Sequence, residues 1–271
     1  MNASDLLATL RYWRECGIDR LSGERCGFLP AQAGASPPRV VLPVSPPRPV
    51  PSIPAPPPIV PAAQPAPPPV TLDRLLTEPV ATGDKPALLE AMAREVGVCS
   101  RCPLSLTRHR PVFGAGSHDA PPVLLVGDFP KEEEEATGEP FGGEVRELLN
   151  GMLAACGWQR REVYLANVIK CRPPGDRQPR SEEVSQCQGH LFGQLEVVRP
   201  RVILALGKVA MDCLLGSGGQ VGAVRGRAHV WRGIPVVVSY HPAFCLRTPA
   251  SKRAVWEDLL FLMKILEKNA V

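Results

Sequence analysis

The sequence predicts an α/β fold: a three-layer αβα domain around a central, mostly parallel, four-stranded sheet. Four short apolar runs rich in valine and leucine are typical of strands buried on both faces of a parallel sheet. Segments with helical periodicity alternate with these runs, as they do in α/β domains. The expected strands are 123–127, 163–167, 202–206 and 236–239, and the expected helices are 145–156, 182–198, 208–215 and 251–267.

This domain is expected over residues 88–271, after a proline-rich linker at residues 31–87. Half of the 32 prolines lie between Pro37 and Pro69, and such a composition favours polyproline II in a largely disordered segment. Residues 1–30 are expected to form a short helical segment, because apolar residues recur there at roughly helical spacing. A single amphipathic helix needs a partner surface, so this helix or the linker is a candidate docking site for another protein. The oligomeric state is not evident from the sequence.

Composition limits the possible partners and the compartment. A net charge of +4 and a pI of about 8.6 permit binding to nucleic acid. Aromatic residues make up 5% of the chain, which argues against an extended base-stacking platform for single strands. We find no pattern of a signal peptide and no apolar stretch long enough to span a membrane. We therefore expect a cytoplasmic protein without membrane contact, with reduced thiols.

Four cysteines are the strongest chemical signal in the chain. Cys99 and Cys102 form a C-x2-C pair, and Cys171 and Cys187 form a C-x15-C pair. Polar, basic and proline-containing sequence surrounds both pairs, which is typical of loops. Thiolates grouped in this way hold either a structural zinc ion or an iron–sulfur cluster, and their spacing leaves both open.

Polar sequence also follows three of the expected strands. Asp128 comes directly after the first run, Asn167 ends the second, and His241 follows the fourth. In parallel α/β sheets, ligands bind at the carboxyl ends of the strands. These side chains are therefore candidates for one site.

Several segments in a fixed order resemble one family. From about Val96 to Leu266 the chain resembles the family 4 uracil-DNA glycosylases, the iron–sulfur branch of the uracil-DNA glycosylase superfamily. The cysteine pairs frame the domain as they do in that family. The matching segments are Gly127-Asp128-Phe129-Pro130, Thr137-Gly138-Glu139-Pro140-Phe141, Asn167-Val168-Ile169-Lys170-Cys171-Arg172-Pro173-Pro174, His241-Pro242-Ala243-Phe244 and residues 252–259.

The resemblance implies how a flipped uracil is bound and released. Phe141 stacks on the base, Phe129 lies against it, and the Asn167 amide reads its hydrogen-bonding edge. His241 donates to the uracil O2, where negative charge develops. Asp128 orients the attacking water or faces the oxocarbenium ion, and Glu134 aligns with a family acid near the sugar.

The resemblance also implies a cofactor and a DNA-binding surface. Cys99, Cys102, Cys171 and Cys187 would hold a [4Fe-4S] cluster that braces a DNA-facing loop without redox work. Leu246 or Arg247 would fill the space left by the extruded base. The residues expected to meet the DNA backbone are Lys170, Arg172, Lys252 and Arg253.

The first motif departs from the family pattern. Asp128 replaces a glutamate, Phe129 replaces a small residue, and Lys131 replaces a glycine. The main hypothesis is a repair glycosylase that excises uracil from DNA, with DNA containing uracil or other deaminated bases as its partner. The alternatives are a catalytically weakened paralogue that binds damaged DNA, and a zinc-binding or redox-sensing nucleic-acid-binding protein.

Overall fold

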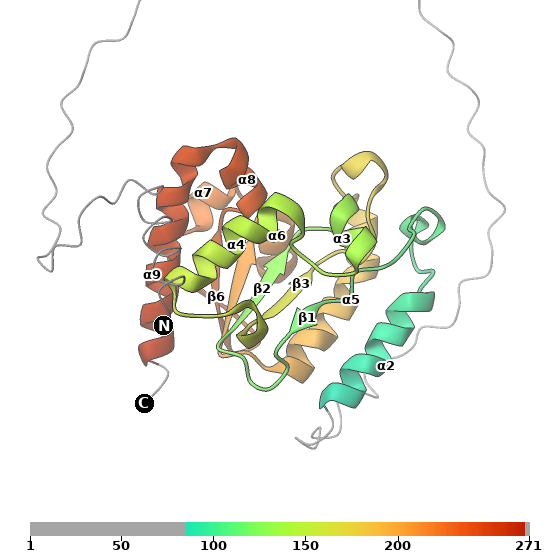
Figure 1. Cartoon of the computed structure of the whole chain (residues 1–271), viewed down its shortest axis with the longest axis horizontal. Helices are drawn as coiled ribbons and strands as arrows, with labels where there is room; N and C mark the ends of the chain where they lie inside the picture. The colour runs from blue at the N-terminus through green and yellow to red at the C-terminus, as the bar shows by residue number, and fades with distance from the viewer. Residues whose placement is uncertain (1–84, 269–271) are drawn as a thin grey trace, which may run out of the picture. The chain divides into compact units, whose positions relative to one another are not determined.

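The computed structural model describes residues 85–268, which fold around one six-stranded sheet (Figure 1). The strand order is β1-β3-β2-β4-β6-β5. The strands are β1 (Ala115–Gly116), β2 (Val123–Gly127), β3 (Tyr164–Asn167), β4 (Val202–Leu206), β5 (Ala228–Trp231) and β6 (Ile234–Ser239).

The four expected strands form the central, parallel part of this sheet, β3-β2-β4-β6. The sheet has six strands rather than four because β1 and β5 add one antiparallel strand to each edge. β1 has only two residues, and β5 alternates exposed and partly buried positions. Neither edge strand carries the continuous apolar run that marks a strand buried on both faces.

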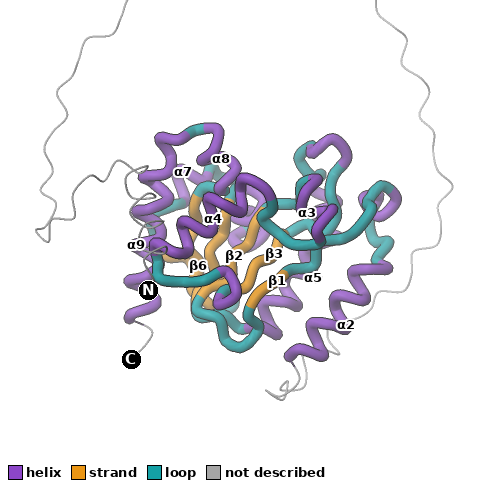
Figure 2. The backbone as a smooth tube through the Cα atoms, viewed as in Figure 1, coloured by secondary structure: helices purple, strands orange, loops and turns teal. Residues whose placement is uncertain are grey.

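Helices cover both faces of the sheet (Figure 2). The four expected helices are α4 (Gly143–Ala155), α5 (Ser181–Val198), α6 (Lys208–Leu215) and α9 (Lys252–Lys268). The sequence analysis did not identify four further α-helices of the described part: α2 (Lys85–Val98), α3 (Glu132–Thr137), α7 (Val221–Val224) and α8 (Pro242–Arg247).

Alternate residues of each strand point into two separate cores, as the period of a strand requires. In β2, Val123 and Leu125 pack with α4, α8 and α9, whereas Leu124 and Val126 pack with α2, α5, α6 and α7. All four of these side chains are essentially inaccessible to solvent. Two apolar layers therefore sandwich the sheet, which confirms the three-layer αβα prediction.

The order of the strands creates a crevice at one edge of the sheet. The chain runs from β2 to β3 on one side and then crosses to β4 on the other side of β2. Parallel α/β sheets bind ligands outside the carboxyl ends of strands at such a switch point. Gly127 of β2 is in register with Asn167 of β3, and Leu206 of β4 with Ser239 of β6, so the polar sequence after each strand meets there.

The predicted N-terminal helix and the proline-rich segment up to residue 84 lie outside the described residues. The domain boundaries therefore stay predictions. Within residues 85–268, no helix combines the length and hydrophobicity needed to cross a bilayer.

Candidate active site and cysteine pocket

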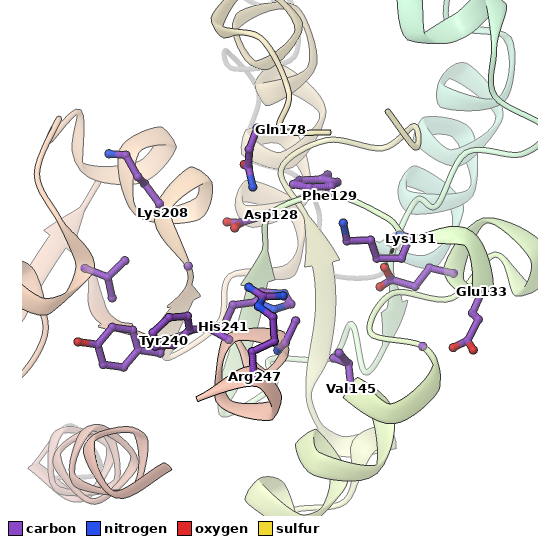
Figure 3. A pocket seen from close by; sticks show the side chains of 16 residues that line it. Asp128, Phe129, Lys131, Glu133, Val145, Gln178, Lys208, Tyr240, His241 and Arg247 are labelled. Carbon is purple, nitrogen blue, oxygen red and sulfur yellow. Dashed lines mark hydrogen bonds between the residues drawn. The ribbon is translucent and has the colours of Figure 1, made fainter. Parts of the chain in front are cut away.

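A cavity of about 330 Å³ lies at the carboxyl ends of the parallel strands. Its wall includes Asp128 after β2, Gly207 after β4 and His241 after β6. Figure 3 shows Asp128, His241 and Arg247 at the centre of this cavity. The expectation that polar residues at separate strand ends share one site is therefore met for Asp128 and His241.

The Asp128 carboxylate turns toward the first turn of α6. Its Oδ1 accepts a hydrogen bond of 3.0 Å from the backbone N–H of Ala210. Gly207 has a φ of 99°, and a Cβ there would lie 2.6 Å from Asp128 Oδ2, so a glycine is required for this approach. Burial raises the pKa of Asp128 to about 6, although hydrogen bonds from Ala210 and Val209 act in the opposite direction. A carboxylate with this pKa is ionised at pH 7 and well suited to accept a proton from water.

His241 begins α8 as its N-cap residue. Its Nδ1 accepts a hydrogen bond of 3.1 Å from the backbone N–H of Ala243, so the ring proton of the neutral form resides on Nε2. Burial lowers the pKa of His241 to about 4, and the cations of Lys131 and Arg247 act in the same direction. At neutral pH this imidazole is therefore an uncharged donor.

Phe141 and Asn167 lie beneath the cavity wall rather than on it. The Phe141 ring stacks on the His241 ring with centroids 5.6 Å apart and an interplanar angle of 20°. A Cβ on Gly127 would lie 2.3 Å from Asn167 Oδ1 and 2.8 Å from Phe141 Cζ, so the missing side chain lets these two residues converge. Both are 1% exposed. The Nδ2 of Asn167 makes no hydrogen bond of normal length, although the Asn167 side chain lies near enough to the Glu134 carboxylate to lower the pKa of Glu134. An unpaired buried donor is costly, and such groups are often found where a ligand binds.

Glu134 holds the backbone around Phe141. Its carboxylate accepts hydrogen bonds from the N–H groups of Lys131 and Phe141, while Arg160 donates to the carbonyl oxygens of Pro140 and Phe141. Phe141 has a φ of 56°, which is uncommon for a bulky residue and requires such support. Burial raises the pKa of Glu134, although these hydrogen bonds lower it. The structure thus places Glu134, the predicted family acid, on the cavity wall as a buried acceptor.

Phe129 connects the cavity with the cysteine region. It lines the cavity but is 7% exposed and packs with Leu104, Ile169 and two of the cysteines. The Lys131 ammonium lies 4.3 Å from the centroid of its ring. Most of the Phe129 side chain is therefore core, and only part of it borders the cavity.

The predicted DNA-contacting residues divide into two groups. Leu246 and Arg247 are exposed on α8, and Arg253 is exposed at the start of α9, near the half-buried Lys252. Arg172 forms ion pairs with Glu132, Glu135 and Asp176. Of the predicted DNA-contacting cations, Arg247 lines the cavity and Arg172 does not.

Lys170 is a correction to the predicted DNA-binding surface. Its side chain is 1% exposed, and its ammonium donates to the carbonyl oxygen of Asn167 at 2.8 Å and to Gln194 Oε1 at 2.5 Å. Gln194 in turn donates to the Tyr164 hydroxyl and the Phe113 carbonyl. A buried ammonium needs such partners, and here one lies at the end of β3 and the other on α5.

The four predicted cysteine ligands line one small pocket, together with Arg101, Arg108 and His190. The Arg108 guanidinium donates to Cys171 Sγ at 3.1 Å, and the backbone N–H of Lys170 donates to Cys187 Sγ at 3.3 Å. Within residues 85–268 no three histidine, cysteine or acidic side chains come together as a ready site for one metal ion. Four sulfurs, two arginines and a backbone N–H donor form a set whose chemistry suits an anionic, thiolate-bound metal centre.

Several residues of the site were missed in the sequence. Arg160 supports Phe141 from a short 3₁₀ turn, and its role rests on contacts across about 20 residues of chain. Tyr240 and Phe244, which flank His241 in sequence, line the cavity, and so do Gln178 and Lys208. Phe244 lies within the recognised His241 segment and Tyr240 directly before it, so this segment was a usable signal.

Comparison with known proteins identifies the family. A model of the uracil DNA glycosylase superfamily matches residues 113–260, more than half of the chain. The protein belongs to the uracil-DNA glycosylase superfamily. It is 39% identical to the type-4 uracil-DNA glycosylase of Thermotoga maritima over 186 residues, which cover 67% of this chain and 96% of the relative.

Two further type-4 uracil-DNA glycosylases support the same placement within the superfamily. The enzyme of Archaeoglobus fulgidus is 37% identical over 63% of this chain and 89% of its own length. That of Pyrobaculum aerophilum is 37% identical over 59% of this chain and 86% of its own length. The resemblance to family 4 inferred from the motifs is thereby confirmed.

Proposed function

We propose that this protein is a uracil-DNA glycosylase, which extrudes uracil from DNA and hydrolyses its N-glycosidic bond. The proposal is supported by membership of the superfamily and by similarity to type-4 uracil-DNA glycosylases over most of their length. One observation in the site carries it: the amide of Asn167 is buried beside the Phe141 ring, and its Nδ2 makes no hydrogen bond of normal length. An amide offers one donor and one acceptor, which complements the edge of uracil and mismatches that of cytosine.

The reaction uses the two groups at the centre of the cavity. Water attacks C1′ of the sugar, the bond from C1′ to N1 breaks, and its electron pair leaves with the uracil. Asp128 faces the developing oxocarbenium ion and accepts the proton from the attacking water. His241 donates its Nε2 proton as a hydrogen bond to uracil O2, where charge accumulates. A neutral imidazole is favoured for this task by the low pKa of His241.

Base binding requires a local rearrangement. The Phe141 ring is 1% exposed and stacks on His241, so neither face is open to a base in the structure described here. We propose that the two rings separate when uracil enters and that the base then covers Phe141. The gap that would open between the Phe141 and His241 rings adjoins the cavity, because His241 and Glu134 line the cavity and also contact Phe141.

We further propose a [4Fe-4S] cluster in the cysteine pocket. Support comes from the four thiols around one cavity and from the N–H donors directed at Cys171 and Cys187. A structural zinc ion held by the same four thiolates is the alternative, and iron content together with visible absorption distinguishes the two. When bound, the cluster would supply rigidity: it would tie the loop after Asn167 to α5 and to the loop after α2.

DNA would dock over α8 and the start of α9. Arg247 lies on the cavity rim, and Leu246 is 37% exposed beside it. Either side chain would occupy the space left by the extruded base, while Lys252 and Arg253 meet phosphates. Arg172 stays a candidate for a phosphate contact at the cysteine loop. The cytoplasmic location and any protein partner of the N-terminal segment remain predictions.

The test is uracil release from a uracil-containing oligonucleotide, with formation of an alkali-labile abasic site. Wild-type protein should release uracil, and Asn167→Ala and His241→Ala should each lower kcat/KM by about 100-fold or more. Cytosine and thymine oligonucleotides are the controls for base selection. No release under conditions in which a type-4 relative is active would refute the proposal.

The second candidate is a weakened, DNA-binding member of the same superfamily, and Phe129 and Lys131 at the cavity favour it. If these two side chains obstruct the base, Phe129→Ala combined with Lys131→Gly should raise uracil release. Because Phe129 is mainly core, we expect instead a stability loss of about 3–5 kcal/mol and no gain in activity. A large gain would support the weakened paralogue.

A further inference from the structure

The proposed reaction uses only part of the cavity. Its volume of about 330 Å³ lies in the range of sites for drug-sized molecules, whereas uracil is a single six-membered ring. Figure 3 shows Lys131 and Glu133 on one side of the cavity, Lys208 and Tyr240 on the other, and Asp128 and His241 between them. The side that contains Tyr240 has no role in breaking the glycosidic bond.

An aromatic surface lies at this second side. Tyr240 and Phe244 stack with centroids 5.1 Å apart and an interplanar angle of 29°. Both line the cavity, as does Val221 of α7, and Phe244 is 36% exposed. The second ring supports Phe244 from behind, so its position is fixed before any ligand arrives. A fixed, open aromatic face is a surface on which a nucleobase stacks.

Cations surround this aromatic surface. Arg247 follows Phe244 by three residues in α8 and lines the same cavity, and Lys208 lines it on the side of Tyr240 (Figure 3). Lys208 is anchored by hydrogen bonds to Asp212 and to the carbonyl oxygen of Gly219. A stacking surface between cations matches a nucleotide, which has a flat base and an anionic phosphate.

We propose that Phe244, supported by Tyr240, stacks the nucleobase adjacent to the extruded uridine in the same strand. This inference rests on the proposed function, since it needs a uridine in the polar part of the cavity. The neighbouring nucleotide is joined to that uridine by one phosphate, so its base arrives at the same cavity. The neighbour must also leave the helix, and the protein therefore favours unpaired DNA over duplex.

The test measures binding to a single-stranded oligonucleotide with 2′-fluoro-2′-deoxyuridine, which resists excision. Either neighbouring base is removed in turn by placing a tetrahydrofuran abasic analogue on the 5′ or the 3′ side. For wild type, removal on one side should weaken binding about tenfold, within the range found for a stacked base. Phe244→Ala should bind the intact oligonucleotide about tenfold more weakly and respond to neither removal. Phe244→Trp should restore both affinity and dependence on the neighbour.

Leu260→Ala is the matched control, because Leu260 is 38% exposed on α9 and does not line the cavity. It should behave as wild type. The proposal is overturned if wild type binds without regard to either neighbour, if it does not bind at all, or if Phe244→Ala and base removal act additively. Circular dichroism of each variant shows whether it is folded, and Phe244→Leu, which keeps apolar volume without a π-face, should resemble Phe244→Ala.

Uracil release, measured separately, distinguishes this inference from the proposed function. If the protein releases uracil but the effect of removing the neighbouring base does not depend on Phe244, only the stacking site is refuted. Intact coupling without release of uracil from a normal substrate refutes only the glycosylase activity.

Discussion

The buried ammonium of Lys170 donates a hydrogen bond of 2.8 Å to the carbonyl oxygen of Asn167, the residue expected to read the base. The backbone N–H of the same lysine donates to Cys187 Sγ. Lys170 therefore links the end of β3 with the cysteine pocket. Through this link the proposed cluster would contribute to the position of the residue proposed to read the base.

Lys170→Met should lower kcat/KM for uracil release by about tenfold with little change in iron content. Methionine matches the apolar stem but leaves the Asn167 carbonyl and Gln194 Oε1 without a donor, while removing a buried charge. The backbone N–H to Cys187 is retained. Lys264→Met, at an exposed site on α9, is the control. Unchanged kinetics in Lys170→Met would show that Asn167 is held by other contacts.

Glu134→Ala should reduce both stability and activity, because two buried N–H groups lose their acceptor. We expect a decrease of roughly 2–4 kcal/mol in the free energy of unfolding and at least a tenfold loss of uracil release. Glu134→Gln keeps one oxygen for the Phe141 N–H and should lose less activity. Denaturant unfolding and single-turnover kinetics measure the two effects. Equal losses for both variants would instead favour a chemical role for this carboxylate.

The activity should decline in acid with an apparent pKa near 6. Burial raises the pKa of Asp128 to about 6, so its catalytic carboxylate is progressively protonated as the pH falls through that value. His241 is already neutral there, because its pKa is lowered to about 4. Asp128→Asn should show low, pH-independent release between pH 5 and 7. A persistent decline near pH 6 in this variant would assign the titration to another group.

The same two groups should have opposite effects on stability in acid. The pKa of Asp128 is higher in the folded protein than its ordinary value of 3.8. Its favourable contribution to the free energy of unfolding is therefore present below about pH 4 and lost as the pH rises through 6. The pKa of His241 is lower in the folded protein than its ordinary value of 6.5. Its favourable contribution to the free energy of unfolding is therefore lost as the pH falls from 6.5 through 4. Wild type should show a shallow dependence in this range. Asp128→Asn should lose stability on acidification, by up to about 2–3 kcal/mol in urea titrations at each pH.

Removal of one cysteine ligand should abolish the cluster. Cys171→Ser should lose most of its iron and visible absorption and unfold at a lower temperature than wild type. Cys156→Ala is the matched control, because Cys156 is only half-buried in α4's C-cap and lies outside the cysteine pocket. Wild type should be brown with about four irons per chain. Stoichiometric zinc in the wild type, with no iron, would contradict the proposed cluster.

The amino-acid sequence determined the framework of this protein. The runs of β2, β3, β4 and β6 are largely apolar because both faces are buried, and α4, α5, α6 and α9 follow helical periodicity. Asp128, Asn167 and His241 were recognisable because ligands bind at the carboxyl ends of parallel strands and because these residues lie in the segments that resemble the family. The family segments and the two cysteine pairs are also local patterns that need no coordinates.

Only the tertiary structure decided where individual polar side chains point. Lys170 stands in a basic segment and reads as a DNA contact, yet it is buried, because its partners Gln194 and the Asn167 carbonyl are brought together by packing. Glu134 stands in an acidic run and became the acceptor for Phe141 through the turn of α3. The pairing of β1 with the more distant β3 and the placement of the Tyr240–Phe244 pair beside the cavity likewise depend on the fold. Burial of a polar group is favourable only when a partner is present, and the fold alone supplies that partner.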